Sequence, residues 1–308
     1  MCFDANYNIQ AEVAIESLII NTTGLFEIHI IHNSPESFDS AMRRIKKNKT
    51  INSINMYKFS RRPGIVFQNF EESHMTEATY YRLFIEDYLP KNINNILYID
   101  PDVVCINNID KYYDSIFDEL SKTEFVISAK TETYEDLDTD TSKRLGITRG
   151  KYFNAGVTFI NLNKWVEKNY TENLILRLSK LGVKGVTYDQ DVMNSFIDGC
   201  YLELPKKLNF TNESLPLNTI LEEVVIYHFL GKKKPWTVKG VYDLGSLSNI
   251  YQKIHRKLHN KNYHIKHVYK PDSVKNFIKL LFTLRILVLK SPGKYFFNFV
   301  TSLKKSKR

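Results

Sequence analysis

Cysteine is scarce in this 308-residue chain, and its three cysteines lie far apart in the sequence. Because Cys2, Cys105 and Cys200 are odd in number and form no CxxC pair, the sequence indicates neither a disulfide framework nor a zinc cluster. This usage favours a reducing compartment and predicts a cytoplasmic protein. Internal repeats and low-complexity segments are also lacking. With 43% hydrophobic and 25% charged residues, the composition is typical of a globular protein with a large core.

A hydrophobic run long enough to cross a bilayer is missing as well. The most apolar part of the C-terminal region, 277–289, has 13 residues and is interrupted by Lys279 and Arg285. A membrane-spanning helix needs about 20 residues. We therefore expect this stretch to lie on a surface rather than to span a membrane.

Acidic residues are absent from residues 273–308, the basic tail, which carry nine Lys and Arg. The other 34 Lys and Arg equal the 34 Asp and Glu, so the whole net charge of +9 belongs to the tail. Bulky apolar residues separate its basic residues, which argues against nucleic-acid binding and favours an anionic membrane surface. In one continuous helix, four residues would form a polar stripe: Lys275, Lys279, Thr283 and Lys290. A helix packed on the body of the protein stays open as the alternative.

The sequence ILYIDPDVVC at 96–105 predicts a buried strand that ends in two aspartates. Asp100 and Asp102 stand two residues apart, so in extended backbone their side chains point to the same side, about 6 to 7 Å apart along the chain. Pro101 between them removes a backbone donor and interrupts the strand ladder. Two carboxylates this close need a cation, and their hard oxygens favour Mg²⁺ or Mn²⁺. A strand-ending turn with two solvated aspartates stays open.

Strands and helices alternate along the chain, which predicts an α/β protein with helices on both faces of a sheet. A helix is expected at 76–89, where Tyr80, Phe84 and Tyr88 would share one face and Arg82 would lie on another. Three residues precede the turn expected at Asp4, so a natural start a few residues upstream stays an alternative. The expected strands are 26–31, 51–57, 96–99, 125–128, 157–161 and 222–229.

Six short blocks in order along the chain carry a family resemblance. They are FDANY at 3–7, TYYRL at 79–83, YIDPDVV at 98–104, FNAGV at 153–157, DQD at 189–191 and HFLGKKKPW at 228–236. Together they resemble the family 8 glycosyltransferases, which are retaining, metal-dependent enzymes. The resemblance implies the GT-A fold, a mixed nucleotide-binding α/β sheet flanked by helices, as a catalytic domain at 1–240. A helical, basic and aromatic appendage at 241–308 would follow it.

The resemblance also implies roles for individual residues. A divalent metal, Mn²⁺ or Mg²⁺, would be held against a UDP-sugar by Asp100, Asp102 and His228. Gln190 would lie near the reacting anomeric carbon. The remaining implied contacts are Asp4, Asn6 and Tyr7 for uracil and ribose, Arg82, Gly231 and Lys234 for the diphosphate, and Asn154 and Asp189, with Gln190, for the donor sugar. The structural alternatives, Asn154 as a turn former and Asp189 as a helix cap, stay open.

The implied activity is a retaining hexosyltransfer of glucose or galactose from a UDP-sugar to a hydroxyl of a cell-surface glycan. Lipopolysaccharide core, a capsule precursor or another lipid-linked glycan would be the acceptor, met at the inner face of the cytoplasmic membrane through the basic tail. We expect front-face attack by the acceptor hydroxyl, with Gln190 stabilising the reacting centre, because no carboxylate is obviously placed as a nucleophile.

One departure from the family leaves the donor sugar open. After the strand VISA, relatives often carry an aspartate that contacts the sugar, whereas this chain has Lys130 and Thr131, followed by Glu132. Two alternatives to hexosyl transfer also remain. One is a non-catalytic sugar-nucleotide- or glycan-binding protein that keeps the pocket, and the other is a metal-dependent phosphodiesterase that cleaves the donor at its phosphate.

Overall fold

The computed structural model describes all residues except 68–75, 133–138, 183–187, 212–214 and 306–308. Its backbone contacts divide the chain into two compact units. The first unit comprises Met1–Glu12, Thr22–Pro101 and Asn108–Asn209, and the second comprises Val13–Asn21, Asp102–Asn107 and Phe210–Arg308. The α/β character predicted from the sequence is confirmed, while the predicted boundary at residue 240 stays a prediction.

The first unit opens with three parallel strands in the order β1-β2-β3. Parallel neighbours need a crossover connection, and the chain supplies one helix between each pair of strands. Ile28, Ile30 and Ile31 on the middle strand are buried, as expected for a strand inside a sheet. The elements are β1 (Cys2–Phe3), η1 (Ala5–Tyr7), α1 (Asn8–Asn21), β2 (Phe26–His32), η2 (Pro35–Phe38), α2 (Asp39–Ile45) and β3 (Ile51–Lys58). The part of α1 from Val13 to Asn21 belongs to the second unit.

Four further strands of the first unit pair in the order β4-β7-β6-β8: β4 (Asn95–Ile99), β7 (Phe153–Asn161), β6 (Ile127–Thr131) and β8 (Leu202–Glu203). Strand β7 is buried along almost its whole length and runs antiparallel to both of its neighbours. The start of β7 therefore lies beside the ends of β4 and β6. Asp100 donates its backbone N–H to the Gly156 carbonyl (2.8 Å), and Lys130 pairs with Asn154. The strand ends that carry the candidate site residues thus meet at one edge.

Helices α4, α6 and α8 pack on these strands. The segment predicted as one helix at 76–89 is instead a 3-10 helix, η3 (Glu77–Phe84), followed by α3 (Ile85–Tyr88). The residues that the prediction placed on different faces, Tyr80, Arg82 and Phe84, are all buried. The other helices of this unit are α4 (Asp110–Ser121), α5 (Thr139–Leu145), α6 (Leu162–Glu167), α7 (Tyr170–Gly182), α8 (Asp189–Ile197) and η5 (Lys206–Leu208).

The second unit contains a short antiparallel pair, β5 (Val103–Cys105) with β9 (Ile226–His228). The strand predicted at 222–229 is shorter than expected, because its first two residues end helix α9 (Leu217–Glu223). Glutamates are favourable in a helix and unfavourable in a strand, so the boundary falls after them. The remaining helices are α10 (Val238–Leu244), η6 (Gly245–Leu247), α11 (Ser248–Leu258), α12 (Pro271–Phe282), η7 (Arg285–Val288) and α13 (Pro292–Lys305).

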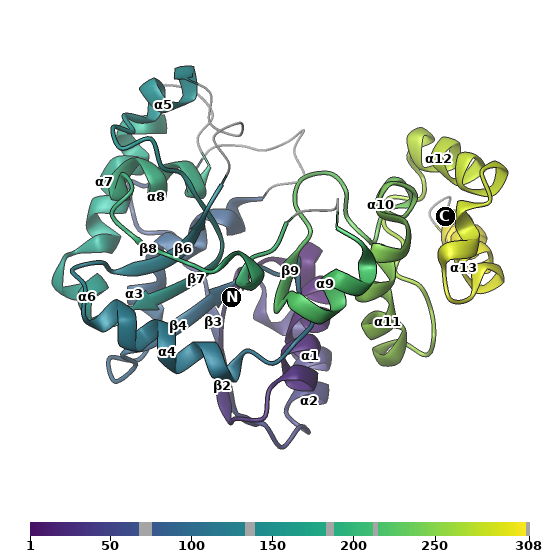
Figure 1. Cartoon of the computed structure of the whole chain (residues 1–308), viewed down its shortest axis with the longest axis horizontal. Helices are drawn as coiled ribbons and strands as arrows, with labels where there is room; N and C mark the ends of the chain where they lie inside the picture. Colours follow the sequence, from purple (N-terminus) through teal and green to yellow (C-terminus); the bar gives the residue numbers. More distant parts are fainter. Residues whose placement is uncertain (68–75, 133–138, 183–187, 212–214, 306–308) are drawn as a thin grey trace. The chain divides into compact units, whose positions relative to one another are not determined.

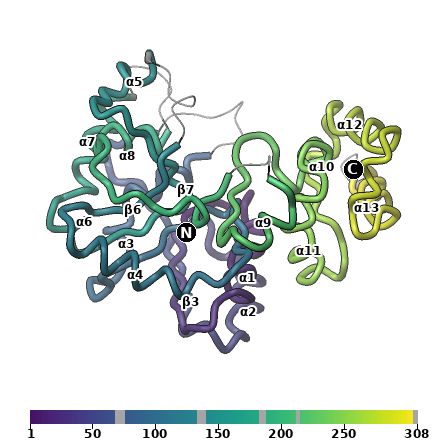
Figure 2. The backbone as a smooth tube through the Cα atoms, in the orientation of Figure 1, coloured from purple at the N-terminus to yellow at the C-terminus, as the bar shows by residue number. Residues whose placement is uncertain are grey.

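The basic tail folds as three helical segments rather than one, and Figure 2 traces its backbone in yellow. Helix α12 ends before Thr283, and Leu284 adopts a left-handed conformation with φ of 55°. The predicted polar stripe is therefore wrong, because Lys290 does not continue the helix that carries Lys275 and Lys279. Among the residues that the structure describes, no helix combines the length and apolarity required to span a membrane.

Candidate functional site

The turn between β4 and β5 carries the paired aspartates, and strand pairing brings a histidine to them. Asp100 directly follows β4, and Asp102 directly precedes β5. The register of β5 with β9 sets Val103 opposite His228, the last residue of β9. The Phe229 N–H donates to the Asp102 carbonyl (3.1 Å), which fixes the two strand ends together. The histidine thus lies beside the turn although it is far away in sequence.

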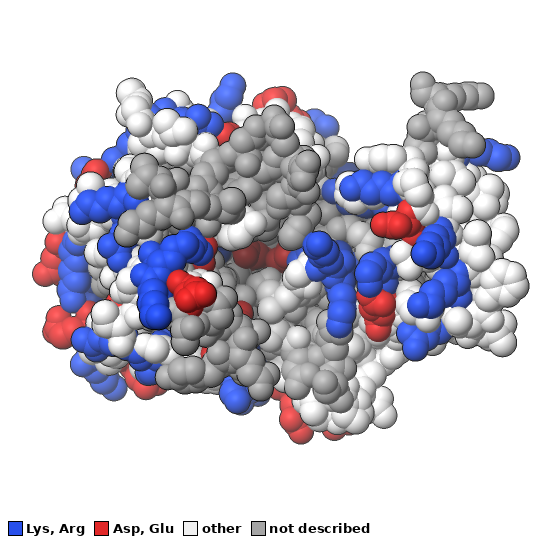
Figure 3. Space-filling view, turned by 90° about the horizontal axis from the view of Figure 1, so that it is seen from above, with Lys and Arg blue, Asp and Glu red and all other residues white. Residues whose placement is uncertain are grey.

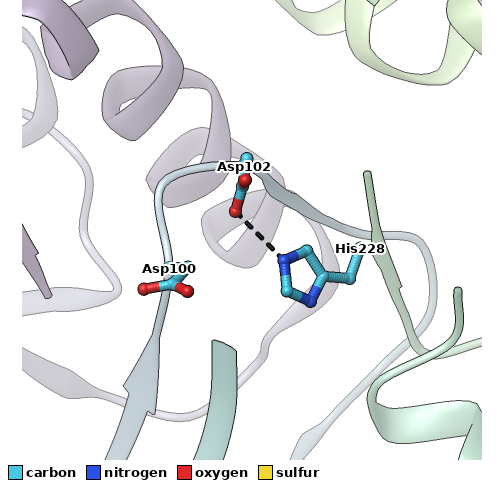
Figure 4. Close-up of side chains that lie close together, drawn as sticks. All are labelled: Asp100, Asp102 and His228. Carbon is cyan, nitrogen blue, oxygen red and sulfur yellow. Dashed lines mark ion pairs between the residues drawn. The ribbon is translucent and has the colours of Figure 1, made fainter. Parts of the chain in front are cut away.

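One ligand atom from each of Asp100, Asp102 and His228 lies within 4.8 Å of the other two. Figure 4 shows these three side chains close together. The Nε2 atom of His228 is 3.2 Å from Oδ1 of Asp102. That Oδ1 atom is buried and accepts no hydrogen bond of good geometry from the described residues. Two carboxylates and an imidazole at this spacing form a donor set that suits Mn²⁺ or Mg²⁺. The residues present therefore fit a divalent ion.

Asp102 also forms an ion pair with Lys234. The Nζ atom of Lys234 lies 2.5 Å from Oδ2 of Asp102 and donates to the Phe229 carbonyl as well. Burial of Asp102 opposes its ionisation, but the charges of Lys234 and His228 outweigh that effect and hold the pKa of Asp102 well below its usual value. The carboxylate is therefore ionised and ready to bind a cation.

A buried arginine holds two carboxylates on the first unit. Arg82 places Nη2 2.6 Å from Asp100 and Nε 2.7 Å from Asp189, and its Nη1 donates to the Ala155 carbonyl (2.8 Å). Burial opposes the charge on Arg82, but the two aspartates outweigh it and raise its pKa. Burial raises the pKa of Asp189, although Arg82 and a hydrogen bond from Thr79 act against the increase. Arg82 thus fixes Asp100 and Asp189 next to each other.

Asn154 and Gln190 are anchored at the start of β7. Gln190 accepts a hydrogen bond from the Ala155 N–H (3.0 Å) through its side-chain oxygen. Asn154 accepts from the Gly156 N–H (3.0 Å) and donates to Glu132 (2.7 Å). The alternative in which Asn154 forms a turn is wrong, because this residue lies inside the strand. Asp189 is the first residue of α8, directly after the N-cap Tyr188, and its carboxylate contacts Arg82 and Thr79 in addition to the Gln190 backbone N–H.

The residues implied for uracil and ribose lie just after β1. Asp4 is buried at the N-terminal end of η1, where its side chain accepts from the Asn6 backbone N–H (2.9 Å) and from the Asn6 side-chain amide (3.3 Å). Asn6 is exposed and Tyr7 is half-buried. The diphosphate candidate Gly231 has a positive φ of 58°, a conformation that glycine adopts without strain.

Sequence reasoning missed three side chains that touch the candidate residues. Thr79 donates to Asp189, Tyr98 donates to Asp100 (2.8 Å), and Asn209 donates to Asn154 (2.9 Å). Thr79 and Tyr98 stand inside the motif blocks, at the first position of TYYRL and of YIDPDVV, and could have been found there. Asn209 carries no such signal.

The departure at Lys130 has a structural counterpart. A bulge between Ala129 and Lys130 shifts the register of β6 against β7. After the bulge, Glu132 hydrogen-bonds Asn154, and the Nζ atom of Lys130 lies 3.5 Å from the same glutamate. Both side chains are nearly buried. The carboxylate of Glu132 therefore reaches Asn154. Glu132 stands two residues after position 130, where the family resemblance leads us to expect an aspartate.

The arrangement of these strands and helices is that of the GT-A fold. The solved galactosyltransferase LgtC, in complex with donor and acceptor sugar analogues, superposes with a TM-score of 0.64 at 19% identity. The match covers 83% of this chain and 94% of LgtC. The GT-A architecture expected from the sequence is therefore confirmed.

The family model described as glycosyl transferase family 8 matches residues 1–240, and the chain belongs to this family. The lipopolysaccharide 1,2-glucosyltransferase of Escherichia coli is 26% identical over 295 residues, with 86% of this chain and 83% of that protein covered. The lipopolysaccharide 1,3-galactosyltransferase of Salmonella typhimurium is 31% identical over 175 residues, covering 54% of this chain and 51% of that protein. The protein is thus an enzyme that transfers a sugar.

Proposed function

We propose that this protein is a retaining hexosyltransferase that moves glucose or galactose from a UDP-sugar to a hydroxyl of a cell-surface glycan. The observation that carries the proposal is the cluster of Asp100, Asp102 and His228, with Lys234 held on the same carboxylate. Such a cluster serves a reaction in which negative charge develops on a phosphate. Relatives named for lipopolysaccharide glucosyl and galactosyl transfer support an acceptor of that kind, or a capsule precursor.

Mn²⁺, or Mg²⁺ in its place, is the cofactor that the donor set favours. When bound, the ion would offset the charge that gathers on the β-phosphate as UDP leaves. Although burial acts against it, the charges of Lys234 and His228 lower the pKa of Asp102 and so favour its carboxylate form. Lys234 supplies a fixed positive charge a few ångströms away, and Gly231 permits backbone N–H groups to approach the diphosphate closely.

Retention of configuration is proposed to follow from front-face attack by the acceptor hydroxyl. Gln190 is anchored by the Ala155 N–H, so the orientation of its amide is set before the sugar binds. Asp189 is held by Arg82 and Thr79 and is positioned rather than free to swing toward the sugar. Trapping of a covalent glycosyl adduct on an aspartate or glutamate would refute this mechanism.

The test is release of UDP by the full-length protein with Mn²⁺, a panel of UDP-sugars and lipopolysaccharide-core oligosaccharides as acceptors. We expect UDP release from UDP-glucose or UDP-galactose and an anomeric configuration in the product that matches the donor. Asp102→Asn should abolish the reaction, whereas Asp118→Asn, an exposed carboxylate on α4, should leave it unchanged. Formation of UMP would identify a phosphodiesterase, and donor binding without turnover would identify a non-catalytic binding protein.

The place of action is part of the same proposal. A lipid-linked acceptor is met most efficiently by an enzyme held at the inner face of the cytoplasmic membrane. The basic tail supplies the charge for such an arrangement, since residues 273–308 contain nine basic residues and no acidic one. Deletion of the tail should therefore reduce transfer to a membrane-bound acceptor more than hydrolysis of the soluble donor.

A further inference from the structure

The C-terminal helices expose an unusual number of large apolar side chains. Within the described chain, seven of the sixteen exposed large hydrophobic residues fall within a stretch of twenty residues. They are Ile278, Phe282, Leu284, Leu287, Val288, Phe296 and Phe297. Scattered exposed apolar residues are normal, but such a concentration marks a surface that another apolar phase covers.

These side chains are exposed although the same helices have a packed core. Phe277 and Phe299 stack with ring centroids 3.8 Å apart, and Leu280 and Tyr295 are fully buried. Val238 and Val241 of α10 join the same cluster. The tail therefore has a packed side and an exposed side, and its contact with a membrane stays a prediction. One side packs on α10, and the other side remains exposed.

The most exposed apolar residues lie at the turn between α12 and η7, which we call the apolar tip (Phe282–Val288). Phe282, Leu284 and Leu287 are 86%, 66% and 64% exposed. Leu284 occupies a left-handed conformation, with φ of 55°, that a leucine adopts only with strain. A glycine would fit at position 284 without strain. The chain instead has a leucine there, between the exposed side chains of Phe282 and Leu287.

Two basic residues near the tip are held by the protein itself. Lys279 and Arg285 each lie 4.5 Å from the ring of Tyr242, and Arg285 also donates to the Tyr242 carbonyl. Lys275 and Lys290 are exposed, and acidic residues are absent from the tail. Figure 3 shows basic side chains next to an uncharged margin on the C-terminal part of the chain, at the right of the view.

We propose that the apolar tip inserts into the headgroup region of an anionic lipid bilayer, with Lys275 and Lys290 contacting the anionic headgroups. Exposed aliphatic and aromatic side chains at a turn, flanked by lysines without acidic partners in the tail, match the amphipathic boundary of such a bilayer. A protein partner or a second copy of this chain would satisfy the apolar residues, but the one-sided positive charge favours lipid.

The apolar tip would mediate the membrane binding that is part of the proposed function. Membrane binding and sugar transfer are measured separately, so either proposal can fail without the other. The test is sedimentation of the full-length protein with vesicles of phosphatidylcholine mixed with phosphatidylglycerol, and with pure phosphatidylcholine vesicles. We expect binding to the mixed vesicles alone. The triple variant Phe282→Ser, Leu284→Ser, Leu287→Ser should bind at least about tenfold more weakly, because three apolar side chains no longer enter the interface.

Matched variants separate a specific surface from general apolarity and charge. Leu25→Ser, Val66→Ser, Leu176→Ser removes three comparably exposed apolar residues elsewhere and should not change binding. Lys275→Glu with Lys290→Glu should weaken binding by about fivefold per lysine. The control Lys46→Glu with Lys47→Glu, on exposed residues after α2, should have a much smaller effect.

Two outcomes would overturn the inference. One is equal vesicle binding by the tip variant and the wild type. The other is a concentration-dependent dimer, seen by light scattering, that the tip variant abolishes while vesicle binding is absent. Asp102→Asn should bind vesicles as the wild type does. If it does, loss of donor turnover and loss of membrane binding report on separate proposals.

Discussion

At the scale of single residues, the central contact is the one between Lys234 and Asp102. Lys234 occupies one oxygen of a carboxylate that the proposed metal also needs. Positive charges repel each other, so Lys234 and a divalent ion share Asp102 at an electrostatic cost. The same lysine nevertheless supplies charge for the departing diphosphate once a nucleotide is bound.

Replacing Lys234 with methionine should therefore have opposite effects on binding and on turnover. Mn²⁺ should bind about tenfold more tightly without nucleotide, because a competing charge is gone. UDP release should slow by on the order of a hundredfold, because charge on the leaving group is less stabilised. Calorimetric titration with Mn²⁺ and an assay of UDP release measure the two effects. Lys232→Met, a change at an exposed position, is the control, and equal Mn²⁺ affinity in both variants would contradict the prediction.

The residue motifs predicted much of the candidate site, but not the contacts within it. The spacing of Asp100 and Asp102 predicted a shared direction, and family resemblance added His228, which the structure places with them. The hydrogen bond between Glu132 and Asn154 could not be predicted, because it depends on the register shift between β6 and β7. A bulge adds a residue without a distinct sequence signature, so every side chain beyond it changes place.

At the scale of secondary structure elements, periodicity predicted most strands within a few residues. Periodicity could not predict the order and direction of the strands in the sheet. Strand β7 is antiparallel to β4 and β6, whereas alternating strands and helices suggest parallel neighbours. The 3-10 helix η3 was missed for a related reason. Six of its eight residues are buried, among them the charged Arg82, so the polar residues do not mark the helical period.

Helix α10 makes a close contact that positions Lys234. A Cβ atom on Gly240 would lie 1.9 Å from the Lys234 carbonyl oxygen, which is far inside the contact distance. Thr237 accepts a hydrogen bond from the Gly240 N–H (3.0 Å) and fixes the first turn of the helix. The backbone of Lys234 therefore packs directly on Gly240, where no larger residue would fit without a shift.

Gly240→Ala should destabilise the protein by about 1 to 3 kcal/mol, the range typical of overpacking. It should also lower UDP release, because the segment that carries Lys234 has to move. Urea denaturation and the release assay measure both effects. Gly293→Ala in α13 is the matched control, since a Cβ there meets no atom within 4 Å. The control should be neutral or stabilising by up to about 1 kcal/mol, and equal behaviour of the two variants would count against the steric argument.

At the scale of the whole molecule, a stack of histidines links folding stability to pH. The rings of His255 and His264 lie 5.0 Å apart, and His259 stacks on His255 at 4.4 Å. Burial, followed by the charges of His255, Lys266, His259 and His267, lowers the pKa of His264 well below its usual value of 6.5. Tyr251 hydrogen-bonds the buried ring of His264 (2.7 Å).

Because the pKa of His264 is lower in the folded than in the unfolded protein, the unfolded chain binds more protons below pH 6.5. Stability should therefore be fully present above that pH and fall as the pH drops below it, by at most about 1.4 kcal/mol per pH unit for this residue. His264→Gln should flatten the dependence measured by urea denaturation between pH 5 and pH 8. An unchanged slope in the variant would assign the dependence to other groups.

The left-handed leucine at the tail also bears on protein engineering. Replacing non-glycine residues of positive φ with glycine is a common route to a more heat-resistant protein, and Leu284 is an obvious target for it. If the tip meets lipid, a Leu284→Gly variant selected for heat resistance would bind the membrane more weakly. A screen that scores melting temperature alone would then favour a protein that performs well in the test tube and poorly in the cell.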